Sequence, residues 1–353
     1  VFEDCGEHGL YISGEVARNA QKVVIDSVTV KDINQVATIP DSAGIKIQKA
    51  DDVVVRDCNF EFAVSVNPLY YVTIFNCNNV RVDGGSGTGC NHTGLSVGSG
   101  EGDSSDVAIH NVHWSHVGVA GAQGALNPVS APVATIPTKT IATACVFTKF
   151  SLGAGNPYYH NCEWQDIEFE LTVTQVATFT DCKFTANSTP DLDRLLRMNS
   201  VAADVIGCRF YGTYTYGIEI RTEMPDVTHI KLHNNYFDRN ATRQIFVSGG
   251  SIAMIGNDAP NSNNNATWQF MAGSVGGDHV ITDNNTAATT TNGLTMSAGV
   301  YARSSDFNYF GNGSPEAALT AYVGSTYQQL DGGAGTSFYV KESGTGNTGW
   351  VAK

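Results

Sequence analysis

The sequence predicts an all-β chain, a parallel β-helix that ends in a small β cap. Short segments in which apolar residues alternate with variable residues recur along the chain. Asp-Cys and Asn-Cys pairs recur with them at a spacing in the twenties, and no long segment has the period of an amphipathic helix. Because one coil cannot bury its own apolar face, neighbouring coils must stack, which builds a solenoid.

The repeated strand is clearest at residues 217–221, which read GIEIR. Its apolar and charged residues alternate, as in a strand with one buried face and one solvent-exposed face. The inward positions stay apolar in each copy, whereas the outward positions change freely and are available for function. Similar segments occur at residues 9–13, 44–48, 94–98, 195–199 and 244–248.

The second element of the repeat is a turn that ends in cysteine. The chain has eight cysteines, none of them in a CxxC motif, and most follow Asp or Asn. Free cysteine buries readily, so the pattern predicts reduced thiols in a core ladder. An aromatic residue often follows two positions later, and we expect Trp114 and Trp164 to pack in the core for this reason. The cysteines predicted to be buried and reduced are Cys58, Cys77, Cys162, Cys182 and Cys208.

The composition limits the classes of partner. Of the 353 residues, 42% are hydrophobic, only 15% are charged and 37 are glycine, which suits a β protein rich in turns. The formal net charge of −14 argues against nucleic acid as the main partner. No apolar run is long enough for a membrane-spanning helix, and no cofactor is expected. Val1 lies inside an already patterned segment, so we expect a further region upstream.

Two stretches interrupt the repeat, and the repeat ends where the residue pattern changes. Residues 118–140 are rich in proline and predict a long loop excursion, and residues 185–194 predict a shorter one. The residue pattern changes near residue 305. We therefore expect a β-helix over residues 1–304 and a cap over residues 305–353, with a hairpin near Asp331-Gly332-Gly333 and with Trp350 packed.

Charged residues gather on the outward positions of three successive coils. Alignment of the copies places Arg197 beside Glu219 and Asn199 beside Arg221, while the preceding coil offers Glu170. Glycoside hydrolysis uses two carboxylates, one as acid and one as base or nucleophile. Two coils separate Glu170 from Glu219 by roughly 9–10 Å at the backbone, with Arg197 between them. We therefore predict Glu170 and Glu219 as the catalytic pair.

Other residues near this pair are candidates for substrate binding. Charged side chains can hydrogen-bond a glycan, and tyrosine rings can stack on sugars. One alternative is a plain surface charge ladder that limits self-repulsion. Another is a lyase, with Arg221 near a sugar carboxylate. The predicted substrate-binding residues are Glu168, Arg197, Arg221, Tyr214 and Tyr216.

Two further clusters are weaker metal candidates. His110, His113 and His116 alternate faces if they lie in a strand, so they need not converge on one ion. The acidic residues of 100–106 lack the carboxylate spacing of an EF-hand loop. We expect no metal site at either cluster.

The C-terminal segment contains a long set of short motifs. They are GSPE at 313–316, DGGAGT at 331–336, YVKESG at 339–344 and GW at 349–350. On these motifs the segment resembles one found in many bacteriophage tail and tail-fibre proteins, although the resemblance covers a small part of the chain.

Residues 5–14, CGEHGLYISG, resemble a coil of the pectate-lyase-like β-helix of phage tailspikes. This resemblance implies a right-handed single-stranded parallel β-helix and a homotrimer that binds bacterial surface polysaccharide and often depolymerises it. It also implies a location in the virion tail, after assembly in the host cytoplasm, with other tail proteins bound through the upstream region. It does not identify catalytic residues. The alternatives are a non-enzymatic receptor-binding or structural tail protein and, disfavoured by the C-terminal segment, a cellular pectate-lyase-like enzyme.

Overall fold

The chain is all-β, and most of its neighbouring strands are parallel. No helix occurs among the residues that the structure describes, and none of these residues belongs to an apolar helix long enough to cross a membrane. The chain divides into two compact units, Val1–Leu171 with Gln175–Thr189 and Thr172–Thr174 with Pro190–Lys353. The computed structural model describes residues 1–3, 8–14, 20–32, 43–62, 70–90, 93–98, 105–116, 124–127, 140–148, 151–152, 157–165, 169–171, 176–186, 192–199, 202–212, 214–221, 229–238, 243–248, 251–259, 268–270, 279–282, 286–287, 294–296, 301–303, 307–344 and 346–353.

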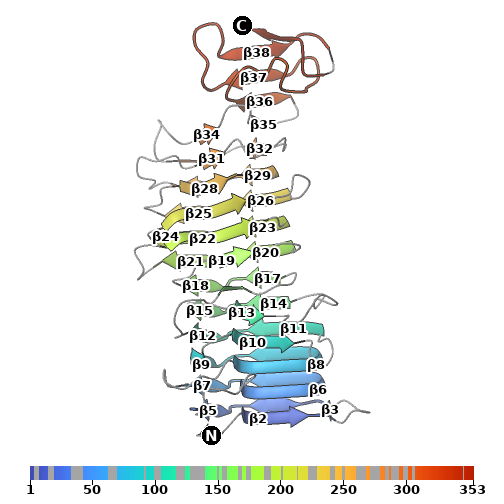
Figure 1. Ribbon diagram of the computed structural model, residues 1–353, viewed down its shortest axis with the longest axis vertical. Helices are drawn as coiled ribbons and strands as arrows, with labels where there is room; N and C mark the ends of the chain where they lie inside the picture. The colour runs from blue at the N-terminus through green and yellow to red at the C-terminus, as the bar shows by residue number, and fades with distance from the viewer. Residues whose placement is uncertain are drawn as a thin grey trace. The chain divides into compact units, whose positions relative to one another are not determined.

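One sheet of the first unit takes a short strand from each repeat. All of its neighbouring strands are parallel, and they lie side by side from blue to green in Figure 1. In spatial order the strands are β1 (Phe2–Glu3), β5 (Thr29–Lys31), β7 (Asn59–Glu61), β9 (Ser86–Cys90), β12 (His113–His116), β15 (Val146–Thr148), β18 (Glu163–Gln165) and β21 (Lys183–Ala186).

The longest strands of the first unit are β6 (Ala43–Arg56) and β8 (Tyr70–Asp83), which are parallel neighbours. The predicted copies pair in register, with Leu10 beside Ile45 and Ile12 beside Ile47. The sequence comparison missed the copy in β8, where Val72 lies between Ile45 and Leu95. The remaining strands are β2 (His8–Ser13), β3 (Ala20–Gln21), β4 (Val24–Asp26), β10 (Thr93–Gly98), β11 (Ser105–His110), β13 (Gly124–Asn127), β14 (Thr140–Thr143), β16 (Ser151–Leu152), β17 (Pro157–His160), β19 (Phe169–Leu171) and β20 (Val176–Thr180).

The second unit contains three sets of parallel strands. In one set the apolar residues stack in register, so that Leu196, Ile218 and Ile245 lie on consecutive strands. That set is β22 (Leu192–Asn199), β25 (Tyr214–Arg221), β28 (Arg243–Val247), β31 (Trp268–Phe270) and β34 (Leu294–Met296). The second is β24 (Arg209–Gly212), β27 (Tyr236–Asp238), β30 (Asp258–Ala259) and β33 (Thr286–Ala287), and the third is β23 (Ala202–Ile206), β26 (His229–His233), β29 (Ser251–Ile255), β32 (His279–Thr282) and β35 (Tyr301–Arg303).

The strand directions change at the end of the second unit. Strand β36 (Asn308–Gly311) is antiparallel to β35 and parallel to β37 (Thr326–Gln329). Strand β38 (Phe338–Lys341) returns antiparallel to β37, which confirms the predicted hairpin, and β39 (Trp350–Ala352) is antiparallel to β38. The predicted packing of Trp350 is also confirmed, because it lies in a buried cluster with Ala321, Tyr327 and Tyr339. The predicted domain boundary at residues 304 and 305 stays a prediction.

Residues with left-handed backbone geometry precede the buried cysteines in the described part of the chain. Asp57, Asn161 and Asp181 have φ between +50° and +53°, a region that Asp and Asn tolerate better than most residues. The N–H of this residue donates to a carbonyl of the next repeat, at 2.8 Å from Asp57 to Asp83 and at 2.9 Å from Asn161 to Thr180. The Asp-Cys and Asn-Cys pairs therefore mark the turns because this backbone geometry favours Asp and Asn, although Ala144 also adopts it before Cys145.

The core consists of ladders of like residues, as the sequence predicts. Cys58, Cys77, Cys162, Cys182 and Cys208 are all buried, which confirms that part of the prediction, while their reduced state stays a prediction. Trp114 and Trp164 are also buried, so their assignment to the core is confirmed. Aromatic rings stack between neighbouring strands: the centroids of Trp164 and Phe184 are 5.0 Å apart, and those of Phe210 and Phe237 are 4.8 Å apart.

Candidate functional site

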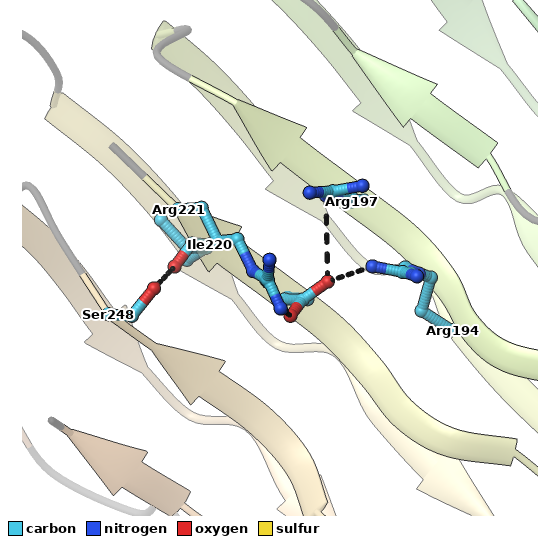
Figure 2. A network of polar contacts seen from close by, with 6 residues as sticks. Arg194, Arg197, Ile220, Arg221 and Ser248 are labelled. Atoms are coloured by element: carbon cyan, nitrogen blue, oxygen red, sulfur yellow. Dashed lines mark hydrogen bonds and ion pairs between the residues drawn. The ribbon is translucent and has the colours of Figure 1, made fainter. Parts of the chain in front are cut away.

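The candidate site is built around Glu219, on β25 of the second unit. Ile218 and Ile220 are buried in the core on either side of it. Glu219 lies opposite Arg197 of β22, and Arg221 lies opposite Asn199, so the predicted register of these two pairs is confirmed. At the next strand, Ser248 donates both its N–H and its hydroxyl to the carbonyl of Ile220, which ties the end of β28 to β25 beside the site (Figure 2).

Three arginines surround the carboxylate of Glu219, as Figure 2 shows. Arg194 donates from Nη1 to Oε2 at 2.6 Å, and Arg221 donates from Nε and Nη2 to Oε1, each at 2.7 Å. Arg197 places its Nε 3.6 Å from Oε2 and completes the ion-pair network. The network, called here the arginine cluster, comprises Arg194, Arg197, Arg221 and Glu219.

The carboxylate is covered, whereas the guanidinium groups reach the surface. The side chain of Glu219 has 0% exposure, while the side chains of Arg194, Arg197 and Arg221 are 18%, 22% and 47% exposed. The expectation that Glu219 lies on the solvent-exposed face of the strand is therefore wrong. The alternation of the strand was predicted correctly, but the arginine side chains lie over the carboxylate and remove it from water.

Glu219 is the common partner of the cluster. One buried carboxylate faces three guanidinium groups. Burying a carboxylate costs several kcal/mol, and the surrounding ion pairs and hydrogen bonds offset this cost. The arrangement fixes the guanidinium group of Arg221 by two contacts while 47% of its side chain stays exposed to a ligand.

The two tyrosines predicted to bind substrate occupy different environments. Tyr214 is buried at 3% exposure, its hydroxyl donates to Oε1 of Gln244 at 3.0 Å, and burial raises the pKa of its phenol well above the usual value. A ring held in this way cannot stack on a sugar, so the structure contradicts that role for Tyr214. Tyr216 is half-buried and its ring lies 5.1 Å from that of Phe246. Its role in substrate binding stays a prediction.

Some predicted residues are not tested by the structure. Glu170 belongs to β19, but its side chain is not described, and Glu168 lies outside the described residues. The catalytic pairing of Glu170 with Glu219 stays a prediction. Arg194 was absent from the predicted set, although it lies three residues before Arg197 on the same strand. Whether Arg194 reaches Glu219 depends on the course of the β22 backbone, and the spacing of the repeats does not predict that course.

The weaker metal candidates give no site in the described part of the chain, where no group of three or more His, Cys, Asp or Glu side chains could hold an ion. His110 lies in β11 and His113 in β12, so the two belong to different strands. The side chain of His116, most of the acidic residues of 100–106, and most of the excursion at 118–140 lie outside the described residues.

Comparison with known proteins gives limited similarity. No protein-family model matches the chain, and no curated protein sequence matches it. Among solved structures, the chain is similar to the catalytic domain of a GH87 alpha-1,3-glucanase in complex with nigerose, at a TM-score of 0.35 and 12% identity. It is also similar to such a domain in complex with tetrasaccharides, at a TM-score of 0.32 and 12% identity. Each match covers 79% of this chain and 64% of the matched chain, so the chain spans about two thirds of those structures. Similarity at this level supplies no argument about function.

Proposed function

We propose that this chain is a phage tail protein that binds an anionic polysaccharide of the bacterial surface through the arginine cluster. The observation that carries the proposal is the fully buried carboxylate of Glu219, which holds Arg194 and Arg221 by hydrogen bonds and Arg197 by an ion pair. Arg221 is held by this carboxylate and is also 47% exposed, so a fixed positive charge reaches the surface. Such a charge suits a ligand with negative charge.

The guanidinium groups supply the chemistry of recognition. Each presents several N–H donors in a plane, a geometry that matches the two oxygens of a carboxylate or the oxygens of a phosphate or sulfate. Arg221 is the most exposed of the three, so we assign it the first contact with the ligand. Because its Nε and Nη2 already donate to Glu219, its guanidinium plane is fixed before a ligand arrives, which lowers the entropy cost of binding.

Glu219 acts in this proposal as a positioning residue. Its carboxylate has no exposed surface, and both of its oxygens accept hydrogen bonds from arginine. A glycosidic oxygen or a water reaches Glu219 only if the arginines move away. This favours the non-enzymatic alternative over hydrolysis by the pair Glu170 and Glu219. Depolymerisation through that pair, or by a lyase reaction near Arg221, stays a prediction.

The scaffold belongs to the same proposal. Parallel sheets, one left-handed residue at each turn, and internal ladders of cysteine and aromatic residues support a parallel β-helix. The right-handed sense of the coil, the homotrimer, the binding of other tail proteins and the location in the virion tail rest on the sequence resemblance alone. Stacked coils of this kind would present the arginine cluster on a rigid face, where a long glycan could lie along several strands.

The test compares Arg221→Gln with the wild-type chain on an array of purified bacterial capsular and lipopolysaccharide glycans, both anionic and neutral. Charge-assisted hydrogen bonds contribute about 1.5–3 kcal/mol, so we expect at least a tenfold loss of affinity for anionic glycans. The matched control is Arg81→Gln, which removes a surface arginine paired with Asp83 in the first unit and should leave binding unchanged. Binding should weaken as salt is added.

Two outcomes contradict the proposal: a wild-type chain that binds no anionic glycan, and an Arg221→Gln variant with unchanged affinity. The same samples decide whether the glycan is cleaved. New reducing ends that appear with the wild-type chain and disappear with Glu170→Gln would establish the depolymerase. Intact glycan after prolonged incubation would leave the protein as a binding module.

A further inference from the structure

A second feature of the second unit, separate from the arginine cluster, lies on the outward face of β24 and β27. A concavity of about 400 Å³ is lined there by Gly207, Arg209, Tyr211, Asn234 and Tyr236. Phe210 and Phe237 occupy the inward positions of the same two strands, where they are buried and stacked. The two tyrosines therefore alternate with core phenylalanines and point to the outside.

The tyrosines form an aromatic surface on two neighbouring strands. The ring centroids of Tyr211 and Tyr236 are 6.0 Å apart and their planes are inclined by 48°, and both side chains are half-buried. Half-buried rings expose part of an apolar face together with a hydroxyl group. The parallel register sets Arg209 beside Tyr236 and Tyr211 beside Asp238, so polar groups border the rings on both strands.

The turns next to these strands also line the concavity. Gly207 and Asn234 both have left-handed geometry, with φ of +66° and +54°, and each precedes the buried residue of its repeat. The exposed Asn234 therefore adds an amide group to the polar border of the two rings.

The charges around this concavity are of both signs. Arg209, Asp238 and Asp258 all act electrostatically on the phenol of Tyr236, so one cation is set against two carboxylates. Burial and these carboxylates raise the pKa of Tyr236, which keeps its hydroxyl neutral and able to donate and accept hydrogen bonds. This environment does not favour an anion. It offers both donors and acceptors, which is what the hydroxyl groups of an uncharged sugar require.

From this juxtaposition we infer that the concavity binds the ring of a neutral sugar residue, stacked on Tyr211 and Tyr236 and hydrogen-bonded at its edge by Arg209 and Asn234. The apolar face of a pyranose ring covers the exposed parts of the two phenols, and its hydroxyl groups reach the polar side chains at the border. The inference goes beyond the proposed function and does not depend on it, because it uses different strands, different residues and an uncharged ligand.

The test uses the full chain and the neutral members of the same glycan array. Tyr211→Ala and Tyr236→Ala should each reduce the affinity for neutral glycans by about tenfold, because each removes one of the two stacking rings. Tyr236→Phe keeps the ring and should lose much less affinity. The matched control is Tyr158→Ala on β17 of the first unit, an exposed tyrosine outside the concavity. Circular dichroism and thermal unfolding verify that every variant is folded.

Three results would overturn the inference. The first is a wild-type chain that binds no neutral glycan, the second is unchanged affinity in a folded Tyr211→Ala variant, and the third is a loss in Tyr236→Phe as large as in Tyr236→Ala. Binding to the anionic glycans of the array reports separately on the arginine cluster. The array can therefore contradict one hypothesis while it supports the other.

Discussion

At the scale of single residues, the position of Glu219 determines what the site can do. An acidic side chain without solvent contact is stable only where cations and donors replace its hydration. Arg194, Arg197 and Arg221 fill this role, and their own mutual repulsion is relieved by the same carboxylate. The four side chains are therefore interdependent, and the loss of the central charge affects all of them.

Glu219→Gln is expected to destabilise the protein. The substitution keeps the shape of the side chain but leaves three neighbouring guanidinium groups without their shared counter-charge. Breaking a buried ion pair costs about 3–5 kcal/mol, and partial exposure of the arginines reduces this to about 2–4 kcal/mol. Urea unfolding measures the change in the free energy of unfolding.

The control for this prediction is Glu163→Gln, which removes the partner of Lys183 from a partly exposed ion pair with a distance of 2.8 Å. Such a pair contributes about 1 kcal/mol or less. If both variants unfold at the same urea concentration, Glu219 is an ordinary surface acid and the arginine cluster is not held together by its charge.

The sequence predicted part of this site. Period-2 alternation placed Glu219 beside Arg197 in the correct register, since the apolar residues of both strands must face the same core. It did not predict the burial of Glu219, which depends on where three long side chains fold over the strand. The suggestion of Tyr214 as a sugar-binding ring did not follow the same alternation, because Tyr214 has the parity of the inward residues Ile218 and Ile220. Its hydrogen bond to Gln244 and its burial agree with that parity.

At the scale of the repeated element, the turn and its buried cysteine are the features that the sequence predicted best. The Asp or Asn before the cysteine reflects a backbone preference, and such preferences are visible in a single chain. The copy in β8 was missed because Tyr71 stands where the copies at 44–48 and 94–98 carry glycine. In two repeats of the second unit the cysteine is replaced by Asn235 and Asn257, which bond to each other and to buried carbonyl groups.

The thiol ladder leads to a prediction about pH. Burial raises the pKa of Cys77 from 9.0 to about 11, and burial also raises the pKa of Cys58. A thiol whose pKa is higher in the folded state contributes stability that is complete below its unfolded pKa. This contribution is lost as the pH rises through the folded pKa. The free energy of unfolding should therefore fall between about pH 9 and pH 11, by about 1 kcal/mol per pH unit for each such thiol.

Thiol labelling and unfolding at several pH values measure this effect together. At pH 8 the folded chain should react slowly with a thiol reagent, and the unfolded, unreduced chain should give nearly all eight thiols. Cys77→Ala is the matched variant, since it should flatten the loss of stability above pH 9. Several disulfides in the unreduced chain, or a Cys77→Ala variant with an unchanged pH profile, would contradict the ladder.

At the scale of the whole molecule, the C-terminal residues expose an unusual number of large apolar side chains. Phe307 and Tyr322 are 52% and 69% exposed and their rings lie 6.5 Å apart, with Val323 next to them. The same segment has its own buried cluster around Tyr327 and Trp350, so these exposed residues are not needed for its internal packing. Adjacent apolar residues at a surface are typical of a contact between chains.

We predict that residues from about 305 onward hold a homotrimer together through this surface. Phe307→Lys combined with Tyr322→Lys should convert the trimer to a monomer, because two charges cannot be buried at an apolar interface without partners. Light scattering coupled to gel filtration gives the mass. Val24→Lys in the first unit, which also replaces an exposed apolar residue, is the control. A wild-type monomer, or a double variant that remains trimeric, would assign the assembly elsewhere.

The left-handed residue at each turn has a consequence for how such a chain can evolve. Its N–H bonds to the following repeat, as from Asp57 to Asp83 and from Asn234 to Ile255, so the alignment of the strands is renewed once per repeat. A gene duplication or deletion that joins one such turn to another would keep every inward residue inward. A gain or loss of a single residue within a strand would reverse the two faces. Length can therefore change by whole repeats, while outward residues such as Arg209 and Arg221 change by single substitutions, and the two kinds of change proceed independently.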